Sequence, residues 1–155
     1  MKVTAVSPKR RLQIKLNNQV LVEIISGLFI LLFVYTAISK LTELRGFRTV
    51  LKSSPLIGGI APYLVWIIPI SELIVVVLLF MPSLRKFGLY MSLLLMICFT
   101  GYLGYMVAFT PSLPCSCGGV IARMSWKEHL LFNVFFLMLA ISGIILNSRM
   151  GKRTA

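Results

Sequence analysis

Long runs of apolar residues dominate the chain, and short polar segments separate them. Four runs are expected to form helices at about 20–38, 61–80, 87–109 and 126–146, the last with a polar lead-in before Leu130. An α-helix rises about 1.5 Å per residue, so roughly 20 residues cross about 30 Å of hydrocarbon. We therefore predict an all-α fold, a polytopic membrane protein built as a bundle of four transmembrane helices.

The polar segments divide the chain into a membrane domain and two tails. We expect residues 1–19 to form a basic cytoplasmic tail, residues 20–147 the four-helix membrane domain, and residues 148–155 a second basic cytoplasmic tail. Residues 41–60 are too polar to span a bilayer, and their spaced apolar positions favour a short amphipathic piece on the membrane surface. The first apolar run is too long for the core of a signal peptide, which favours an uncleaved first helix.

Charge then sets the expected orientation and the environment. Charged residues make up only 13% of the chain, against about a quarter in soluble proteins. Ten of the sixteen basic residues fall in the two tails and the loop around 81–86, so both termini should be cytoplasmic in a bacterial inner membrane. The net charge of +12 is then explained by topology and by contact with anionic lipid of the bilayer. Nucleic-acid binding is excluded, because the basic residues are spread over both sides and no binding motif occurs.

A pair of thiols lies between the third and fourth apolar runs, in Pro114-Cys115-Ser116-Cys117-Gly118-Gly119. The expected orientation places this loop outside the cytoplasm, where disulfides persist. The Cα atoms of residues two apart span at most about 7 Å, so Cys115 and Cys117 can close only a small disulfide ring. A strained and exposed disulfide is typical of redox exchange. The following helix N-terminus, with Arg123 and Lys127 nearby, favours the thiolate.

Other interpretations of the cysteines stay open. Two thiolates could bind a soft metal such as Cu(I), and the pair could instead be structural or bonded to a partner chain. Cys98 falls near the middle of the third run and is expected to pack as a small apolar residue.

Two ionisable residues in the apolar runs are candidates for proton chemistry. Glu72 lies in the middle of the second run, three residues after Pro69, and a carboxyl group at membrane depth normally faces the bundle interior. Its expected role is that of a proton carrier or an ion-pair anchor, and its candidate partners are Lys40 and His129. A protonated core residue is the structural alternative for Glu72, and a satisfied core residue for His129, the sole histidine.

Two local patterns have structural interpretations. Ser125-Trp126-Lys127-Glu128 fits a capping box, which gives Glu128 a role at a helix start. Small residues inside the runs are expected to let helices approach closely: Ser26, Gly27, Ser92, Gly101, Gly104, Ser142 and Gly143.

Three segments together resemble a known family. Ala37-Ile38-Ser39-Lys40 closes the first helix, Pro69-Ile70-Ser71-Glu72 lies inside the second, and Pro-Cys-Ser-Cys-Gly-Gly precedes the fourth. The chain resembles the DoxX-like membrane proteins and, within them, the methylamine utilisation protein MauE group, over about residues 20–147. The resemblance implies a four-helix inner-membrane bundle linked to redox maturation of extracytoplasmic proteins, such as the disulfide-rich small subunit of methylamine dehydrogenase.

The resulting hypothesis is an extracytoplasmic thiol–disulfide exchange protein. Its candidate catalytic residues are Cys115, Cys117, Glu72 and His129, and its expected partner is a thioredoxin-like or disulfide-containing protein. Because the chain has no second cysteine pair, electrons would pass directly to that partner or to a quinone. The alternatives are a non-enzymatic membrane assembly factor and a copper transporter or chaperone; no other metal site is expected.

Overall fold

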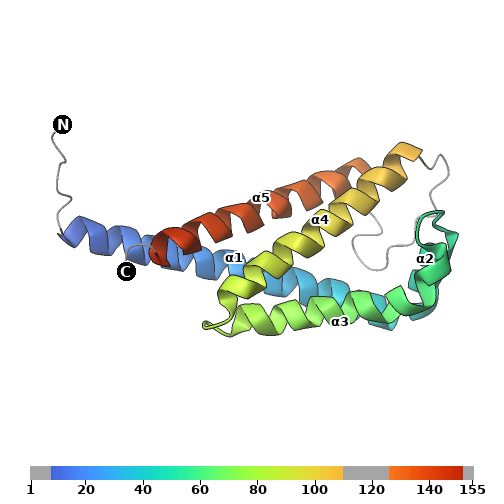
Figure 1. The fold of residues 1–155 in the computed structure, drawn as a ribbon, viewed down its shortest axis with the longest axis horizontal. Coiled ribbons are helices and arrows are strands. Elements are labelled where there is room, and N and C mark those ends of the chain that lie inside the picture. Colours follow the sequence, from blue (N-terminus) through green and yellow to red (C-terminus); the bar gives the residue numbers. More distant parts are fainter. Residues whose placement is uncertain (1–7, 110–125, 152–155) are drawn as a thin grey trace.

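The computed structural model describes residues 8–109 and 126–151, and these residues are almost entirely helical (Figure 1). Along the chain the elements are α1 (Pro8–Thr42), α2 (Leu44–Ser53), the short 3-10 helix η1 (Gly58–Ile60), α3 (Ala61–Phe80), α4 (Arg85–Phe109) and α5 (Trp126–Gly151). Four stretches of helix are long and apolar enough to cross a membrane: Asn17–Thr42, Gly58–Phe80, Arg85–Phe109 and Lys127–Arg149. The predicted all-α fold with four transmembrane helices is confirmed.

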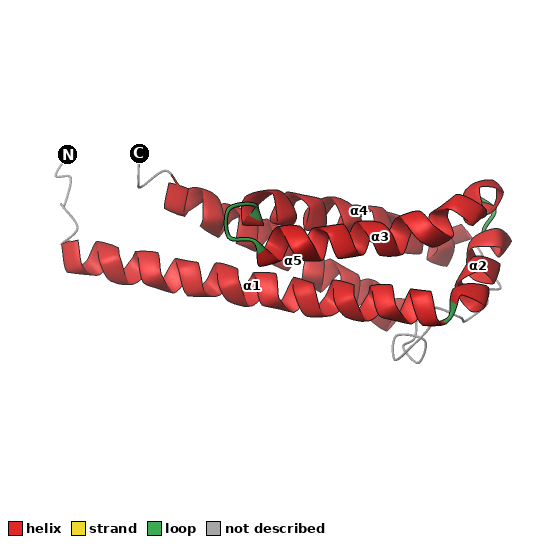
Figure 2. Cartoon of the chain, turned by 90° about the horizontal axis from the view of Figure 1, so that it is seen from below, coloured by secondary structure: helices red, strands yellow, loops and turns green. Residues whose placement is uncertain are grey.

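The four long helices form an antiparallel bundle. Helix α1 packs beside α3 and α5, and α4 packs beside the same two helices, so α1 and α4 lie diagonally opposite. The start of α1, the end of α5 and the α3–α4 turn lie at one end of the bundle, while α2 lies across the other (Figure 2). We call these the terminal end and the α2 end. Helix α4 ends and α5 begins at the α2 end (Figure 1).

Apolar side chains fill the centre of the bundle and also cover its outside. Phe29 stacks on Phe33 at 5.7 Å between ring centroids and meets Phe136 edge-on at 5.4 Å. On the outer surface, Leu31 is 69% exposed and Phe80 76% exposed. A soluble protein rarely exposes large continuous apolar surface. The exterior is therefore suited to lipid, and the helices satisfy their own backbone groups as a bilayer requires.

Helix α1 begins at Pro8, well before the apolar run that starts at Val20. The intervening residues are mainly Lys, Arg, Leu, Gln and Asn, and most of these types favour helix. Proline is well tolerated at a first helical position because its missing N–H would have no partner there. The helix thus extends past the membrane stretch into part of the segment that we expected to be a tail.

The segment between the first two membrane helices contains a strongly amphipathic helix. In α2, Leu51 is buried against Ala61 and Val65 of α3, whereas the cationic side chains point outward. A Cβ atom on Gly58 would lie 2.7 Å from the Lys52 carbonyl oxygen, so the return from α2 requires glycine. This compact turn fixes α2 across the end of the bundle.

One sequence expectation about small residues is wrong in part, and another is wrong. Added Cβ atoms on Gly27, Gly101 and Gly104 would meet nothing within 4 Å, so these glycines do not mediate close helix contacts. The expectation is confirmed at Gly143, where an added Cβ atom would lie 3.2 Å from the side chains of Ile25 and Leu89. A further close contact occurs at Gly88, which was not among the expected residues. Likewise, the side chain of Cys98 is exposed. It follows Met91 and Leu94 at helical spacing on the lipid-facing side of α4, so it does not pack inside the bundle.

Candidate functional site

A buried ion pair joins α1 to α3 in the half of the bundle nearer α2. The Nζ atom of Lys40 lies 2.7 Å from Oε1 of Glu72, and the side chains are 21% and 1% exposed, respectively. Helical side chains tilt toward the N-terminus of their helix. Lys40, in the last turn of α1, therefore extends inward to the middle of the antiparallel α3 instead of outward to water. Of the two candidate partners for Glu72, Lys40 makes the direct contact.

Thr36, one helical turn before Lys40 in α1, makes hydrogen bonds with both members of the ion pair. Its Oγ1 donates a hydrogen bond to Glu72 Oε1 at 3.1 Å, and its carbonyl oxygen accepts one from Lys40 Nζ at 3.3 Å. The i, i+4 spacing of Thr36 and Lys40 places both on one face of α1. Two donors therefore converge on the same carboxylate oxygen.

The second oxygen of the carboxylate has different surroundings. Oε2 of Glu72 is buried and has no hydrogen-bond partner among the described residues. A buried polar atom without a partner costs free energy, so such an atom calls for a functional or structural explanation. Chemically, this oxygen is available to accept a proton or a hydrogen bond.

Aromatic rings enclose the cation. The Lys40 ammonium lies 6.0 Å from the ring centroid of Phe47 on α2 and 5.7 Å from that of Phe99 on α4. These distances are within the range of cation–π attraction. Because α1 and α3 supply the ion pair and α2 and α4 supply the rings, the site depends on the packing of four helices.

Two residues that follow Phe99 in α4 also have buried polar atoms without hydrogen-bond partners in the described part of the chain. Thr100 Oγ1 and Tyr102 Oη are buried and lack hydrogen-bond partners among the residues that the structure describes. In α3, Pro69 is buried one turn before Glu72. A proline inside a helix has no N–H to donate to the carbonyl four residues earlier. The α2-side half of the bundle thus contains more free hydrogen-bonding capacity than its apolar composition suggests.

His129 lies in the first turns of α5 and is half-buried. The groups that interact with the Glu72 carboxylate are Lys40 and Thr36, and His129 is not among them. The imidazole is instead within electrostatic range of the Lys40 ammonium. The structure therefore brings His129 near the ion pair but not into it.

The two candidate cysteines, Cys115 and Cys117, lie outside the described residues, as does Ser125 of the expected capping box. The described helices on either side of this segment are α4, which ends at Phe109, and α5, which begins at Trp126. Both of these helix termini are at the α2 end of the bundle (Figure 1).

Sequence reasoning found Lys40 and Glu72 but missed Thr36, Phe47 and Phe99. Thr36 could have been found, because it precedes Lys40 by one helical turn on the same face. The rings could not, because their contact with Lys40 depends on how α2 and α4 fold back onto α1.

Comparison with known proteins assigns the family. Residues 18–146 match the family described as methylamine utilisation protein MauE. No curated protein and no solved structure gave a match. The match extends from the start of the first membrane stretch almost to the end of the fourth. It confirms the resemblance inferred from the three sequence segments, and the chain belongs to the MauE family.

Proposed function

We propose that this MauE-family membrane protein carries out thiol–disulfide exchange at the extracytoplasmic face of the bacterial inner membrane. The exchange would support the maturation of extracytoplasmic proteins. The family description supports methylamine utilisation as the setting, with a methylamine dehydrogenase-type protein as the client.

The proposed step uses Cys115 and Cys117 as a redox pair. A client dithiol attacks the Cys115–Cys117 disulfide, so the client gains a disulfide while the pair takes up two electrons and two protons as thiols. Reoxidation passes the two electrons and two protons to a quinone, which becomes a quinol, or to the disulfide of a thioredoxin-fold partner. The cycle therefore needs groups that accept and return protons near the pair.

The observation that carries this proposal is the free Oε2 of the buried Glu72 carboxylate. Lys40 and Thr36 hold the other oxygen, so the carboxylate is fixed in place while Oε2 stays available to a proton. His129, in the first turns of α5, is a second proton-carrying group in electrostatic contact with Lys40. Glu72 is on α3 and His129 is on α5, and both of these helices begin at the α2 end. The end of α4, which precedes the cysteine segment, is also at the α2 end.

Thiol trapping in intact cells tests the redox role. With Cys98→Ser as background, acid quenching and alkylation with a mass-adding maleimide separate the reduced and oxidised forms of the pair. We expect a mixed population that shifts when the quinone pool or the extracytoplasmic oxidant is perturbed. One fixed state, insensitive to both, would overturn the redox role and favour the assembly factor. Copper that co-purifies and disappears with Cys115→Ser/Cys117→Ser would favour the metal-binding alternative.

The role of the carboxylate needs its own test. Glu72→Gln keeps the shape of the side chain but removes its ability to carry a proton, and loss of general acid–base catalysis costs on the order of a hundredfold in rate. We expect reoxidation of the pair to slow by about that factor. The matched control is Glu23→Gln, which removes a half-exposed carboxylate at the terminal end and should leave the rate unchanged. Equal rates in all three proteins would exclude Glu72 as the proton carrier.

A further inference from the structure

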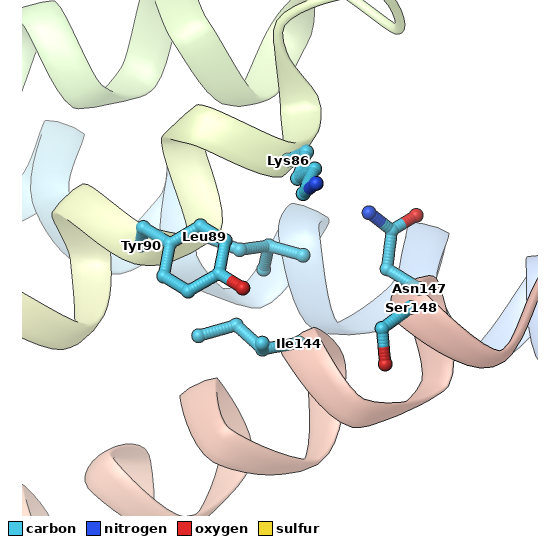
Figure 3. Close-up of a pocket in the computed structure, with 6 residues that line it drawn as sticks. All are labelled: Lys86, Leu89, Tyr90, Ile144, Asn147 and Ser148. Carbon is cyan, nitrogen blue, oxygen red and sulfur yellow. The ribbon is translucent and has the colours of Figure 1, made fainter. Parts of the chain in front are cut away.

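A small cleft opens between α4 and α5 at the terminal end of the bundle, far along the helices from the ion pair. Its empty space of about 170 Å³ includes the open space at its mouth, and it is lined by Lys86, Leu89, Tyr90, Ile144, Asn147 and Ser148 (Figure 3). Lys86 is close to the start of one membrane-length stretch, and Asn147 is close to the end of another. This position corresponds to the level of lipid headgroups.

The lining is polar on one side and apolar on the other. The Lys86 ammonium and the Asn147 amide face each other across the opening, and Leu89 and Ile144 lie next to them (Figure 3). The Ser148 hydroxyl already donates to the Ile145 carbonyl oxygen at 2.9 Å. The donors that the cleft offers to an anion are therefore the Lys86 ammonium, the Asn147 amide and the Tyr90 hydroxyl.

The charge around the cleft favours an anion from outside the protein. The chain has only four acidic residues, Glu23, Glu43, Glu72 and Glu128. Glu23 is at the terminal end, where it contacts Arg85 at 3.5 Å. Neither of the two ion pairs among the described residues includes Lys86. Because Arg149 in the last turn of α5 adds to the positive charge at this end, an anionic ligand would be attracted to it.

We propose that this cleft binds the phosphate headgroup of an anionic phospholipid. Basic pockets between transmembrane helices commonly bind such headgroups. The lining residues leave room for little more than one water molecule between them, so the phosphate would lie at the mouth of the cleft, between Lys86 and Asn147, and not inside it. The phosphate contacts Lys86, Tyr90 and Asn147, while an acyl chain continues from Leu89 and Ile144 along the apolar exterior. This apolar continuation favours a lipid over free phosphate, and the proposal does not depend on the thiol chemistry.

Native mass spectrometry of the full-length protein tests the site. Detergent-purified protein is mixed with phosphatidylglycerol or with phosphatidylcholine, and the lipids that stay bound are counted. We expect the wild-type protein to retain more phosphatidylglycerol than phosphatidylcholine. Lys86→Gln should weaken that retention about fivefold, the effect of roughly one interfacial charge. Asn147→Leu should weaken it as well, without changing the charge.

Arg149→Gln is the matched control, because it removes the same charge at the same end from a residue that does not line the cleft. We expect this variant to bind phosphatidylglycerol like the wild type. Equal losses in Lys86→Gln and Arg149→Gln, or equal retention of the two lipids, would overturn the site in favour of general surface attraction. Displacement of the lipid by millimolar inorganic phosphate would identify free phosphate as the ligand instead. Unchanged helical circular dichroism establishes that each variant is folded.

Discussion

At the scale of single residues, the central feature is a lysine and a glutamate paired inside an apolar bundle. Removing charges from water is costly, and in a protein interior a buried pair recovers that cost only when its geometry and hydrogen bonds are good. Lys40 and Glu72 meet this condition at one oxygen, through a short contact and the Thr36 hydrogen bond. Each charge therefore depends on the other for its place in the membrane.

Truncation of one member should accordingly be harmful. Glu72→Ala leaves the Lys40 ammonium without its counter-ion, and loss of one partner of a buried pair typically costs about 3–5 kcal/mol. We expect a loss of that order in the free energy of unfolding, measured by denaturant titration in mixed micelles. Glu23→Ala, in the more exposed pair with Arg85, should cost less than about 1 kcal/mol. Similar losses in the two variants would contradict a special role for the buried pair. The double variant Lys40→Met/Glu72→Leu should recover part of the lost stability, because no unpaired charge remains.

Thr36 should contribute less to the free energy of unfolding than Glu72 does. Thr36→Val removes the hydroxyl that donates to Glu72 Oε1 while keeping the shape of the side chain, and a hydrogen bond to a charged group is worth about 1.5–3 kcal/mol. We expect a loss in that range in the same unfolding assay. Thr49→Val provides the comparison, since its hydroxyl donates only to an exposed backbone carbonyl oxygen of α2. A Thr36→Val protein as stable as Thr49→Val would show that the hydrogen bond contributes little.

At the scale of elements, glycine determines how tightly α3 and α4 come together. A Cβ atom on Gly88 would lie 2.9 Å from the Leu79 backbone nitrogen and equally close to the Leu79 side chain. Backbone atoms cannot move aside as a flexible side chain can, so this position tolerates only hydrogen. The short turn after Phe80 and the start of α4 thus form a compact helical hairpin.

Two glycine-to-alanine substitutions separate this contact from helix propensity. Gly88→Ala should destabilise the protein by about 1–3 kcal/mol, the usual cost of overpacking. Gly101→Ala, on the same helix with nothing within 4 Å of the added methyl group, should be neutral or stabilising by up to about 1 kcal/mol. Both values come from denaturant titration of the purified proteins. A stabilising Gly88→Ala would mean that α3 and α4 are farther apart than described.

At the scale of the whole molecule, the bundle presents two different ends. The terminal end carries the start of α1, the end of α5 and the lipid-binding cleft that we propose. In the sequence, most of the basic residues fall in the two tails and the loop around 81–86. The other end carries α2, and the ion pair lies in the adjoining half of the bundle. Such an asymmetry in basic residues predicts that the terminal end faces the cytoplasm.

Accessibility of introduced cysteines tests this orientation. In a chain with its three native cysteines replaced by serine, Ser53→Cys at the end of α2 and Ser148→Cys near the end of α5 are both exposed positions. A membrane-impermeant maleimide added to intact cells should label Ser53→Cys and spare Ser148→Cys. The reverse pattern would invert the topology and place the cysteine segment in the cytoplasm, against the proposed exchange reaction. Labelling of both positions after cell lysis provides the accessibility control.

The sequence alone determined the membrane-spanning architecture, because the length and composition of an apolar run depend only on local chain properties. It also indicated Glu72, since a carboxyl group within an apolar run is unusual in any fold, and it named Lys40 as a candidate partner. Tertiary structure decided the rest. The convergence of Thr36, Phe47 and Phe99 on the ion pair, the outward position of Cys98 and the close approach at Gly88 all depend on how helices rotate and pack against each other. In a helix that is apolar on all sides, no hydrophobic face distinguishes the side toward protein from the side toward lipid, so packing alone makes that choice.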